Sequence, residues 1–135
     1  MKSLSVLVAD DEPSIRDLVQ LWLTEAGHRP IGVANATEAA RVMAKERFDL
    51  VITDVLMPDG DGLQLIAKFK AAQPAARILA ISGGGRYMEG DDCLKLARGL
   101  GADAAVIKPF KRPDLLAGVA AALAPEARPE KPRGK

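Results

Sequence analysis

"LSVLVADDEP", residues 4–13, is an apolar run followed by three consecutive acids and a proline. The apolar part has the length and the Leu and Val content of a buried strand. Pro13 suits the first turn of a helix, where its missing N–H has no partner to lose. Like charges about 4 Å apart repel by roughly 4 kcal/mol at an effective dielectric of ~20. The stretch therefore predicts a strand and a helix, with either a cation or solvent among the acids between them.

The same alternation continues along the chain. Short apolar runs rich in Val, Ile and Leu predict strands at 4–9, 29–34, 49–53, 77–82 and 103–107. Helical periodicity lies between and after them, carried by Ile15 to Trp22, Ala39 to Met43 with Asn35 or Thr37 as N-cap, Leu63 to Phe69, Leu94 to Leu100, and Leu116 to Leu123. Five strands alternating with five helices predict an α/β fold, (βα)5, with a doubly wound parallel sheet covered on both faces.

Composition sets limits on the class of protein. The chain has 135 residues, of which 48% are hydrophobic and 27% charged, values typical of one globular domain. A net charge of +1 argues against a dedicated nucleic-acid binder. The single cysteine, Cys93, excludes an internal disulfide. We see no signal peptide and no membrane-spanning apolar stretch, so a cytoplasmic protein with no membrane partner is expected.

The end of the chain differs from the rest. Residues 125–135 are rich in proline, lack periodicity and carry four basic and two acidic residues. We expect a folded domain over residues 1–124 and a disordered, basic tail over 125–135. With no further sequence after the tail, a single-domain protein without an output module is expected.

Polar side chains follow four of the predicted strands. Asp10 and Asp11 follow the first, Asp54 the third, Ser82 the fourth and Lys108 the fifth. In an open parallel sheet these strand ends meet at one edge, where ligands bind. The carboxylates suit Mg²⁺, and the hydroxyl and ammonium suit a phosphoryl group, which an aspartate can also accept covalently. Taken alone, the first two acids could equally be a helix N-cap and a first-turn acid.

Four segments together resemble a known family. "VLVADDEP" (6–13), "DLVITDVLMPDGDG" (49–62), "ILAIS" (78–82) and "VIKPF" (106–110) are similar, in this order, to the motifs of the response-regulator receiver domain of two-component signalling, particularly chemotaxis-like regulators. The resemblance runs from about residue 4 to residue 123. It implies the flavodoxin-like strand order 2-1-3-4-5.

The resemblance also implies a metal site. Asp11 would bind Mg²⁺ directly, and Asp10 would act largely through water. Asp54 and the backbone carbonyl of Leu56 would complete the protein ligands.

For the phosphoryl group, the resemblance implies that Asp54 is the acceptor, with phosphate supplied by the phosphohistidine of a sensor kinase or phosphotransfer protein. Ser82 would donate its hydroxyl to the phosphoryl oxygens, and Lys108 would pair with them. The bond between Lys108 and Pro109 would be cis, although only ~5–6% of X–Pro bonds are.

One departure from the family pattern concerns the way in which phosphorylation would reach the output surface. Receivers usually carry Tyr or Phe three residues before the lysine, and this chain has Ala105. We expect the phosphorylated protein, a monomer or weak dimer, to bind a downstream protein through its fourth helix, fifth strand and fifth helix. Movement would begin in the glycine run 83–85.

Two other functions are compatible with parts of the pattern. A Mg²⁺-dependent phosphatase with an aspartyl-phosphate intermediate would need a second aspartate two residues after Asp54, where Leu56 stands. A non-phosphorylated pseudo-receiver tends to lose the acids or the lysine, and both are present. We therefore expect a phosphoacceptor and not an enzyme.

Overall fold

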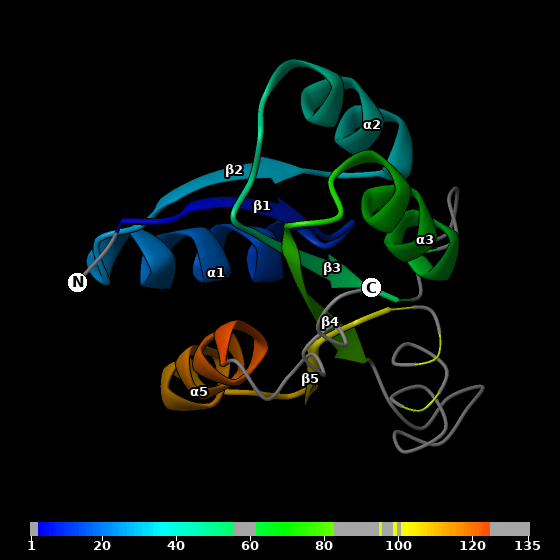
Figure 1. Cartoon of the computed structure of the whole chain (residues 1–135). Coiled ribbons are helices and arrows are strands. Elements are labelled where there is room, and N and C mark those ends of the chain that lie inside the picture. Colours follow the sequence, from blue (N-terminus) through cyan, green and yellow to red (C-terminus); the bar gives the residue numbers. More distant parts are fainter. Residues whose placement is uncertain (1–2, 56–61, 83–94, 96–98, 100, 125–135) are drawn as a thin grey trace.

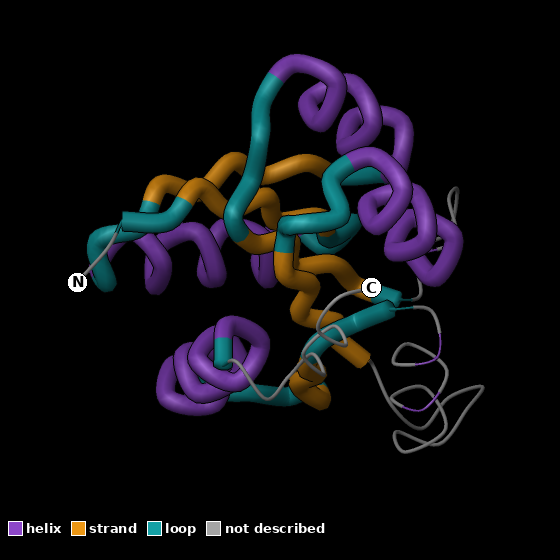
Figure 2. The backbone as a smooth tube through the Cα atoms, viewed as in Figure 1, coloured by secondary structure: helices purple, strands orange, loops and turns teal. Residues whose placement is uncertain are grey.

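A parallel sheet with helices on both faces forms the protein (Figures 1 and 2). The computed structural model describes residues 3–55, 62–82, 95, 99 and 101–124. Within them the strands are β1 (Ser5–Ala9), β2 (Arg29–Val33), β3 (Leu50–Asp54), β4 (Arg77–Ser82) and β5 (Ala104–Ile107). The helices are α1 (Pro13–Glu25), α2 (Ala36–Lys45), α3 (Gly62–Ala72) and α5 (Arg112–Leu123). All neighbouring strands are parallel and their order is β2-β1-β3-β4-β5, so the predicted fold is confirmed.

Some predictions concern parts of the chain that the structure leaves undescribed. The helix expected around residues 94–100 falls largely outside the described residues. The glycine run 83–85 and the tail 125–135 fall outside them entirely. The expected output surface therefore stays a prediction.

Side chains that alternate along each strand build two cores. In β1, Val6 and Val8 face α1 and α5, while Leu7 and Ala9 face α2 and α3. Figure 1 shows α1 and α5 on one side of the sheet and α2 and α3 on the other. Because both faces are covered, the central strands are mainly apolar, and every residue of β3 is buried.

Local sequence explains where the first helices begin and end. Pro13 opens α1, and Gly27 follows its end at φ 94°, a conformation that glycine adopts without strain. Asn35 caps α2, because its side chain accepts a 2.8 Å hydrogen bond from the N–H of Glu38. Of the two N-caps that the sequence allowed, the structure uses Asn35.

Close packing holds α5 against the end of the sheet. A Cβ on Gly118 would lie 2.5 Å from Cγ2 of Val106, so the glycine permits the close approach of α5 to β5. Ala105, at the position where an aromatic residue was expected from the family, is partly buried against the core on the α2 and α3 side. Packing therefore holds β5 in place, and Lys108 directly follows this strand.

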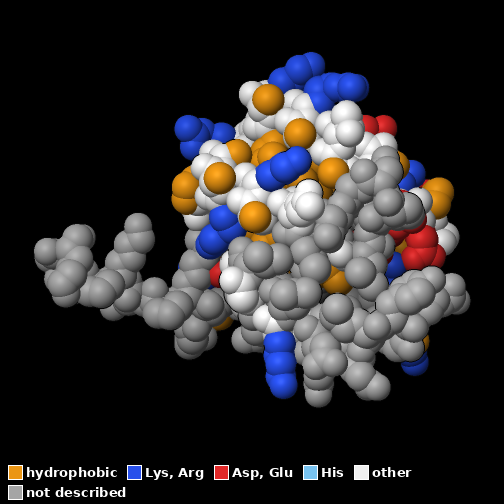
Figure 3. Space-filling model, turned by 90° about the vertical axis from the view of Figure 1, so that its right-hand side faces the viewer, with side chains coloured by type: hydrophobic (Ala, Val, Ile, Leu, Met, Phe, Trp, Pro, Cys, Tyr) orange, Lys and Arg blue, Asp and Glu red, His pale blue; other side chains and the backbone are white. Residues whose placement is uncertain are grey.

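One face of the molecule carries both basic and hydrophobic side chains among its described residues. In Figure 3, Lys and Arg side chains are spread over the face, with hydrophobic side chains between them. None of the described helices combines the length and the hydrophobicity of a membrane span.

Candidate functional site

The order of the strands brings the first two acids together. After β1 the chain crosses to β2 on one side and returns as β3 on the other, so β1 and β3 are neighbours. Their register pairs Ala9 with Thr53, which places Asp10 and Asp54 side by side at the carboxyl edge. This is the position at which doubly wound sheets bind ligands. Lys108 reaches the same edge, directly after the end of β5.

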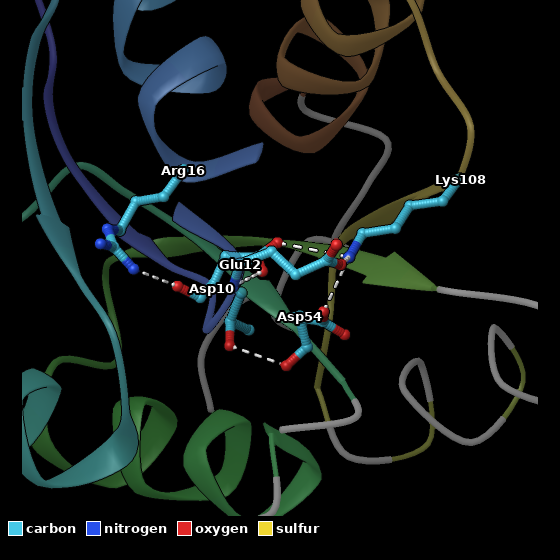
Figure 4. Close-up of polar contacts among 6 residues, drawn as sticks. Asp10, Glu12, Arg16, Asp54 and Lys108 are labelled. Atoms are coloured by element: carbon cyan, nitrogen blue, oxygen red, sulfur yellow. Dashed lines mark hydrogen bonds and ion pairs between the residues drawn. The ribbon is translucent and has the colours of Figure 1, made fainter. Parts of the chain in front are cut away.

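Lys108 lies at the centre of the acids (Figure 4). Its Nζ is 2.7 Å from Oε1 of Glu12 and 3.0 Å from Oδ2 of Asp54, and it donates a hydrogen bond to each. Oδ2 of Asp10 is 3.5 Å from the same Nζ. The side chains of Asp10 and Asp54 are buried, whereas that of Glu12 is 54% exposed. The single positive charge of Lys108 therefore offsets only part of the negative charge of three carboxylates, two of them buried and one exposed.

Asp10 is held in place but incompletely satisfied. Its Oδ1 accepts a 2.9 Å hydrogen bond from the N–H of Glu12, and its carbonyl accepts a 2.8 Å bond from Nη1 of Arg16. Its buried Oδ2 has no hydrogen-bond donor. Burial raises the pKa of Asp10 from 3.8 to about 6, against the lowering effects of the Glu12 N–H and the Lys108 charge. An additional cation at this oxygen would stabilise the carboxylate.

For the pKa of Lys108, the effect of the neighbouring acids outweighs that of burial. Burial alone would lower the pKa of Lys108. The hydrogen bonds to Glu12 and Asp54, together with the charges of Asp54 and Asp10, raise that pKa above its ordinary value. Lys108 is therefore a permanent cation at the edge of the sheet.

The structure brings three of the predicted site residues together, namely Asp10, Asp54 and Lys108. Ser82 ends β4 at the same edge, and its side chain is outside the described part of the structure. Leu56 also lies outside it. Asp11 is half-buried and does not belong to the group of acids whose oxygens lie close together.

Glu12 is a site residue that the sequence did not single out. The sequence showed a third acid after β1, and nothing in its pattern told whether the side chain would cap α1 or turn to the edge of the sheet. In the structure Glu12 is the N-cap of α1, yet its side chain makes no capping bond and contacts Lys108 instead. The Lys108–Pro109 bond is cis, as the resemblance implied.

The acids fit a divalent cation. Asp10, Glu12 and Asp54 each offer a carboxylate oxygen, and these oxygens lie within 4.8 Å of one another. The buried Oδ2 of Asp10 lacks a donor, as a metal ligand would before the metal binds. Hard oxygen ligands of this kind suit Mg²⁺.

A cavity of about 330 Å³ adjoins the acids. Its lining joins the start of α1 to the segment after β5 and consists of Glu12, Ile15, Leu18, Lys108, Pro109 and Phe110. The site is therefore accessible from the side on which Glu12 is exposed.

Comparison with known proteins agrees with this geometry. The family model described as "Response regulator receiver domain" matches residues 6–120. The DNA-binding transcriptional regulator NtrC of Rhizobium meliloti is 35% identical over 132 residues, which are 97% of this chain and 26% of the relative. NtrC of Azospirillum brasilense is 40% identical over 82 residues, 61% of this chain and 17% of the relative. The chain thus spans about a quarter or less of these relatives.

Solved structures show the same fold. The chemotaxis response regulator CheY4 of Vibrio cholerae superposes with a TM-score of 0.81 at 27% identity, covering 90% of this chain and 100% of that one. NtrX from Brucella abortus superposes with a TM-score of 0.83 at 31% identity, covering 90% of this chain and 27% of that one.

Proposed function

This chain belongs to the response regulator receiver domain family, and we propose that it accepts a phosphoryl group on the carboxylate of Asp54. The observation that carries the proposal is the contact between Lys108 Nζ and Oδ2 of Asp54 at 3.0 Å, beside further carboxylates that fit a divalent cation. The donor is the phosphohistidine of a sensor kinase or phosphotransfer protein.

The transfer exchanges one bond of phosphorus for another. A carboxylate oxygen of Asp54 forms the new P–O bond while the P–N bond breaks, and the electron pair of that bond stays on the leaving imidazole. Such reactions depend mainly on positioning and on charge neutralisation. Lys108 supplies a fixed positive charge beside Asp54. Ser82, at the end of β4, donates its hydroxyl to the phosphoryl oxygens.

The resident metal in this proposal is Mg²⁺, held by Asp10, Asp11, Asp54 and the carbonyl of Leu56. When bound, it neutralises charge on the phosphoryl oxygens. Asp11 is the direct ligand in this assignment although it lies outside the close group of acids. A Mg²⁺ titration tests the assignment, since Asp11→Asn should weaken binding more than Asp10→Asn.

The output in this proposal is binding to another protein after phosphorylation, in the cytoplasm. The expected monomeric or weakly dimeric state, the single-domain organisation and the lack of a nucleic-acid partner remain predictions. The length of the NtrC relatives gives a clear alternative, in which a receiver of this kind is one part of a larger regulator.

The test of phosphoryl acceptance is incubation with acetyl phosphate and Mg²⁺, followed by intact mass measurement and peptide mapping. We expect the mass of one phosphoryl group, on the peptide that contains Asp54, and its loss on treatment with hydroxylamine. Asp54→Asn should abolish labelling. Asp49→Asn is the matched control, because Asp49 precedes the same strand at its opposite end and should label like wild type. Equal labelling of Asp54→Asn and wild type would refute the proposal.

A further inference from the structure

We propose that Glu12 is a positioning residue for phosphoryl acceptance, a releasable counterion that holds the Lys108 ammonium until the phosphoryl group replaces it. The inference rests on the function proposed above. It concerns an acid that the sequence pattern left unassigned, and it starts from the 2.7 Å contact between Oε1 of Glu12 and Nζ of Lys108.

Hydrogen bonds fix the backbone of Glu12, while its side chain makes no capping bond and can contact Lys108. The N–H of Glu12 donates to Oδ1 of Asp10, and its carbonyl accepts the N–H of Arg16 in the first turn of α1. An acid at this N-cap position could accept bonds from the helix, but its side chain makes none. The carboxylate therefore extends across the edge of the sheet to Lys108.

The three partners of Lys108 differ in how easily they can be exchanged. Asp10 and Asp54 are buried, so separating either from the ammonium would remove a favourable contact that water cannot readily replace. Glu12 is 54% exposed, so water can solvate its carboxylate after the contact breaks. Of these three acids, Glu12 is the one that Lys108 can release at low cost.

The arrival of a phosphoryl group makes that release necessary. An ammonium has three donors, and Lys108 already has three carboxylate neighbours: it donates hydrogen bonds to Glu12 and Asp54 and lies 3.5 Å from Oδ2 of Asp10. A phosphoryl oxygen beside Asp54 would compete for the donor directed at Glu12. The Glu12 carboxylate also adds a negative charge to the entrance of the site, which repels an anionic phosphodonor. Both effects predict that Glu12 slows acceptance and keeps Lys108 in place beforehand.

The experiment measures the initial rate of Asp54 labelling by acetyl phosphate at saturating Mg²⁺ in wild type, Glu12→Gln and Glu12→Asp. Glu12→Gln keeps the size of the side chain and removes its charge, so we expect labelling about threefold faster, the factor to which an exposed ion pair amounts. Glu12→Asp restores the charge, so its rate should return toward that of wild type. A purely structural role would not order the variants by charge.

Salt provides a second readout. At about 1 M salt the screening length falls to roughly 3 Å, so the rate difference between wild type and Glu12→Gln should shrink. Glu25→Gln is the matched control, because Glu25 is 50% exposed at the other end of α1 and pairs with Arg112 at 3.2 Å. It changes the net charge equally and should label at the wild-type rate.

The outcomes separate this inference from the proposed function. If wild type is labelled on Asp54 and Glu12→Gln labels at the same rate or more slowly, the role of Glu12 is wrong and the proposed function stands. If a Mg²⁺ titration of the labelling rate shows that Glu12→Gln needs a higher Mg²⁺ concentration for half its maximal rate, without a faster rate at saturation, Glu12 serves the metal and the inference is also wrong. If wild type is not labelled, both fail.

Discussion

Aspartates stand at both ends of the strands, and the two ends use them differently. At the amino edge, Asp49 precedes β3 and Asp103 precedes β5. Each donates its N–H to a neighbouring strand's carbonyl and accepts that residue's N–H on Oδ2, Asp49 with Ser5 and Asp103 with Ile78. At the carboxyl edge, Oδ2 of Asp10 is buried without a donor and shares Lys108 with other acids.

This difference fits a structural role for the acids at the amino edge and the proposed ligand-binding role for those at the carboxyl edge. An acid whose oxygen accepts an N–H of the neighbouring strand supplies a hydrogen bond that the strand end would otherwise lack. A buried acid that lies close to other acids and lacks some of its hydrogen bonds lowers the free energy of unfolding. A fold retains such an acid where its charge acts on a ligand. Neutralising an acid should therefore change stability in opposite directions at the two edges.

The largest effect is expected from removing the cation at the carboxyl edge. Lys108→Met removes the ammonium that the buried Asp10 and Asp54 contact, and breaking a buried pair in this way costs about 3 to 5 kcal/mol. We expect urea unfolding at neutral pH to show a loss of this order. Adding Asp10→Asn to Lys108→Met should recover part of the loss, because one of the uncompensated charges is then absent. A stability equal to wild type would contradict the view of Lys108 as an essential counterion.

The second prediction concerns how the buried carboxyl group of Asp10 makes the stability of the fold depend on pH. Burial raises the pKa of Asp10 to about 6 from 3.8, so the folded state binds its proton more tightly than the unfolded state does. The stability from this group is fully present below pH 3.8 and is lost as the pH rises through about 6. The difference amounts to about 2 to 3 kcal/mol.

Without Mg²⁺, Asp10→Asn should therefore be more stable than wild type by about that amount at pH 7.5. The gain should disappear near pH 4, where the wild-type carboxyl is protonated. Chemical unfolding at the two pH values, with EDTA present, measures it. A variant that is less stable than wild type at pH 7.5 would show that the charge of Asp10 is well accommodated.

Much of this contrast could be predicted from the sequence, and part of it could not. The strand boundaries and the convergence of Asp10, Asp54 and Lys108 follow from hydrophobic periodicity and from the rule that parallel strands end at one edge. The side-chain directions of Asp11 and Glu12 do not follow, because neighbouring positions in a turn have no fixed periodicity. The bonds of Asp49 and Asp103 were also missed, since they depend on the register between strands far apart in sequence.

The third prediction concerns Asp103 at the amino edge. Asp103 is buried, and Asp103→Ala removes the oxygen that accepts the N–H of Ile78 at 2.8 Å. A buried donor without a partner costs about 1 to 3 kcal/mol, so we expect a loss of about 2 kcal/mol in urea unfolding. Phosphorylation by acetyl phosphate should proceed at the wild-type rate. A slower rate would show that the two edges are coupled and would weaken the distinction between them.

The smallest effect is expected from an Asp→Asn substitution at the amino edge, although the same change at Asp10 is expected to stabilise the protein. Asp49→Asn keeps a side-chain oxygen that can accept the 2.8 Å bond from the N–H of Ser5, and the half-buried position allows water to reach the amide. Only the difference between a charged and a neutral acceptor is lost, about 0.5 to 1 kcal/mol. Thermal and urea unfolding should place Asp49→Asn slightly below wild type at pH 7.5, while Asp10→Asn lies above it. If Asp49→Asn also gains stability, the charge at the amino edge is as unfavourable as that of Asp10, and the division between structural and functional acids fails.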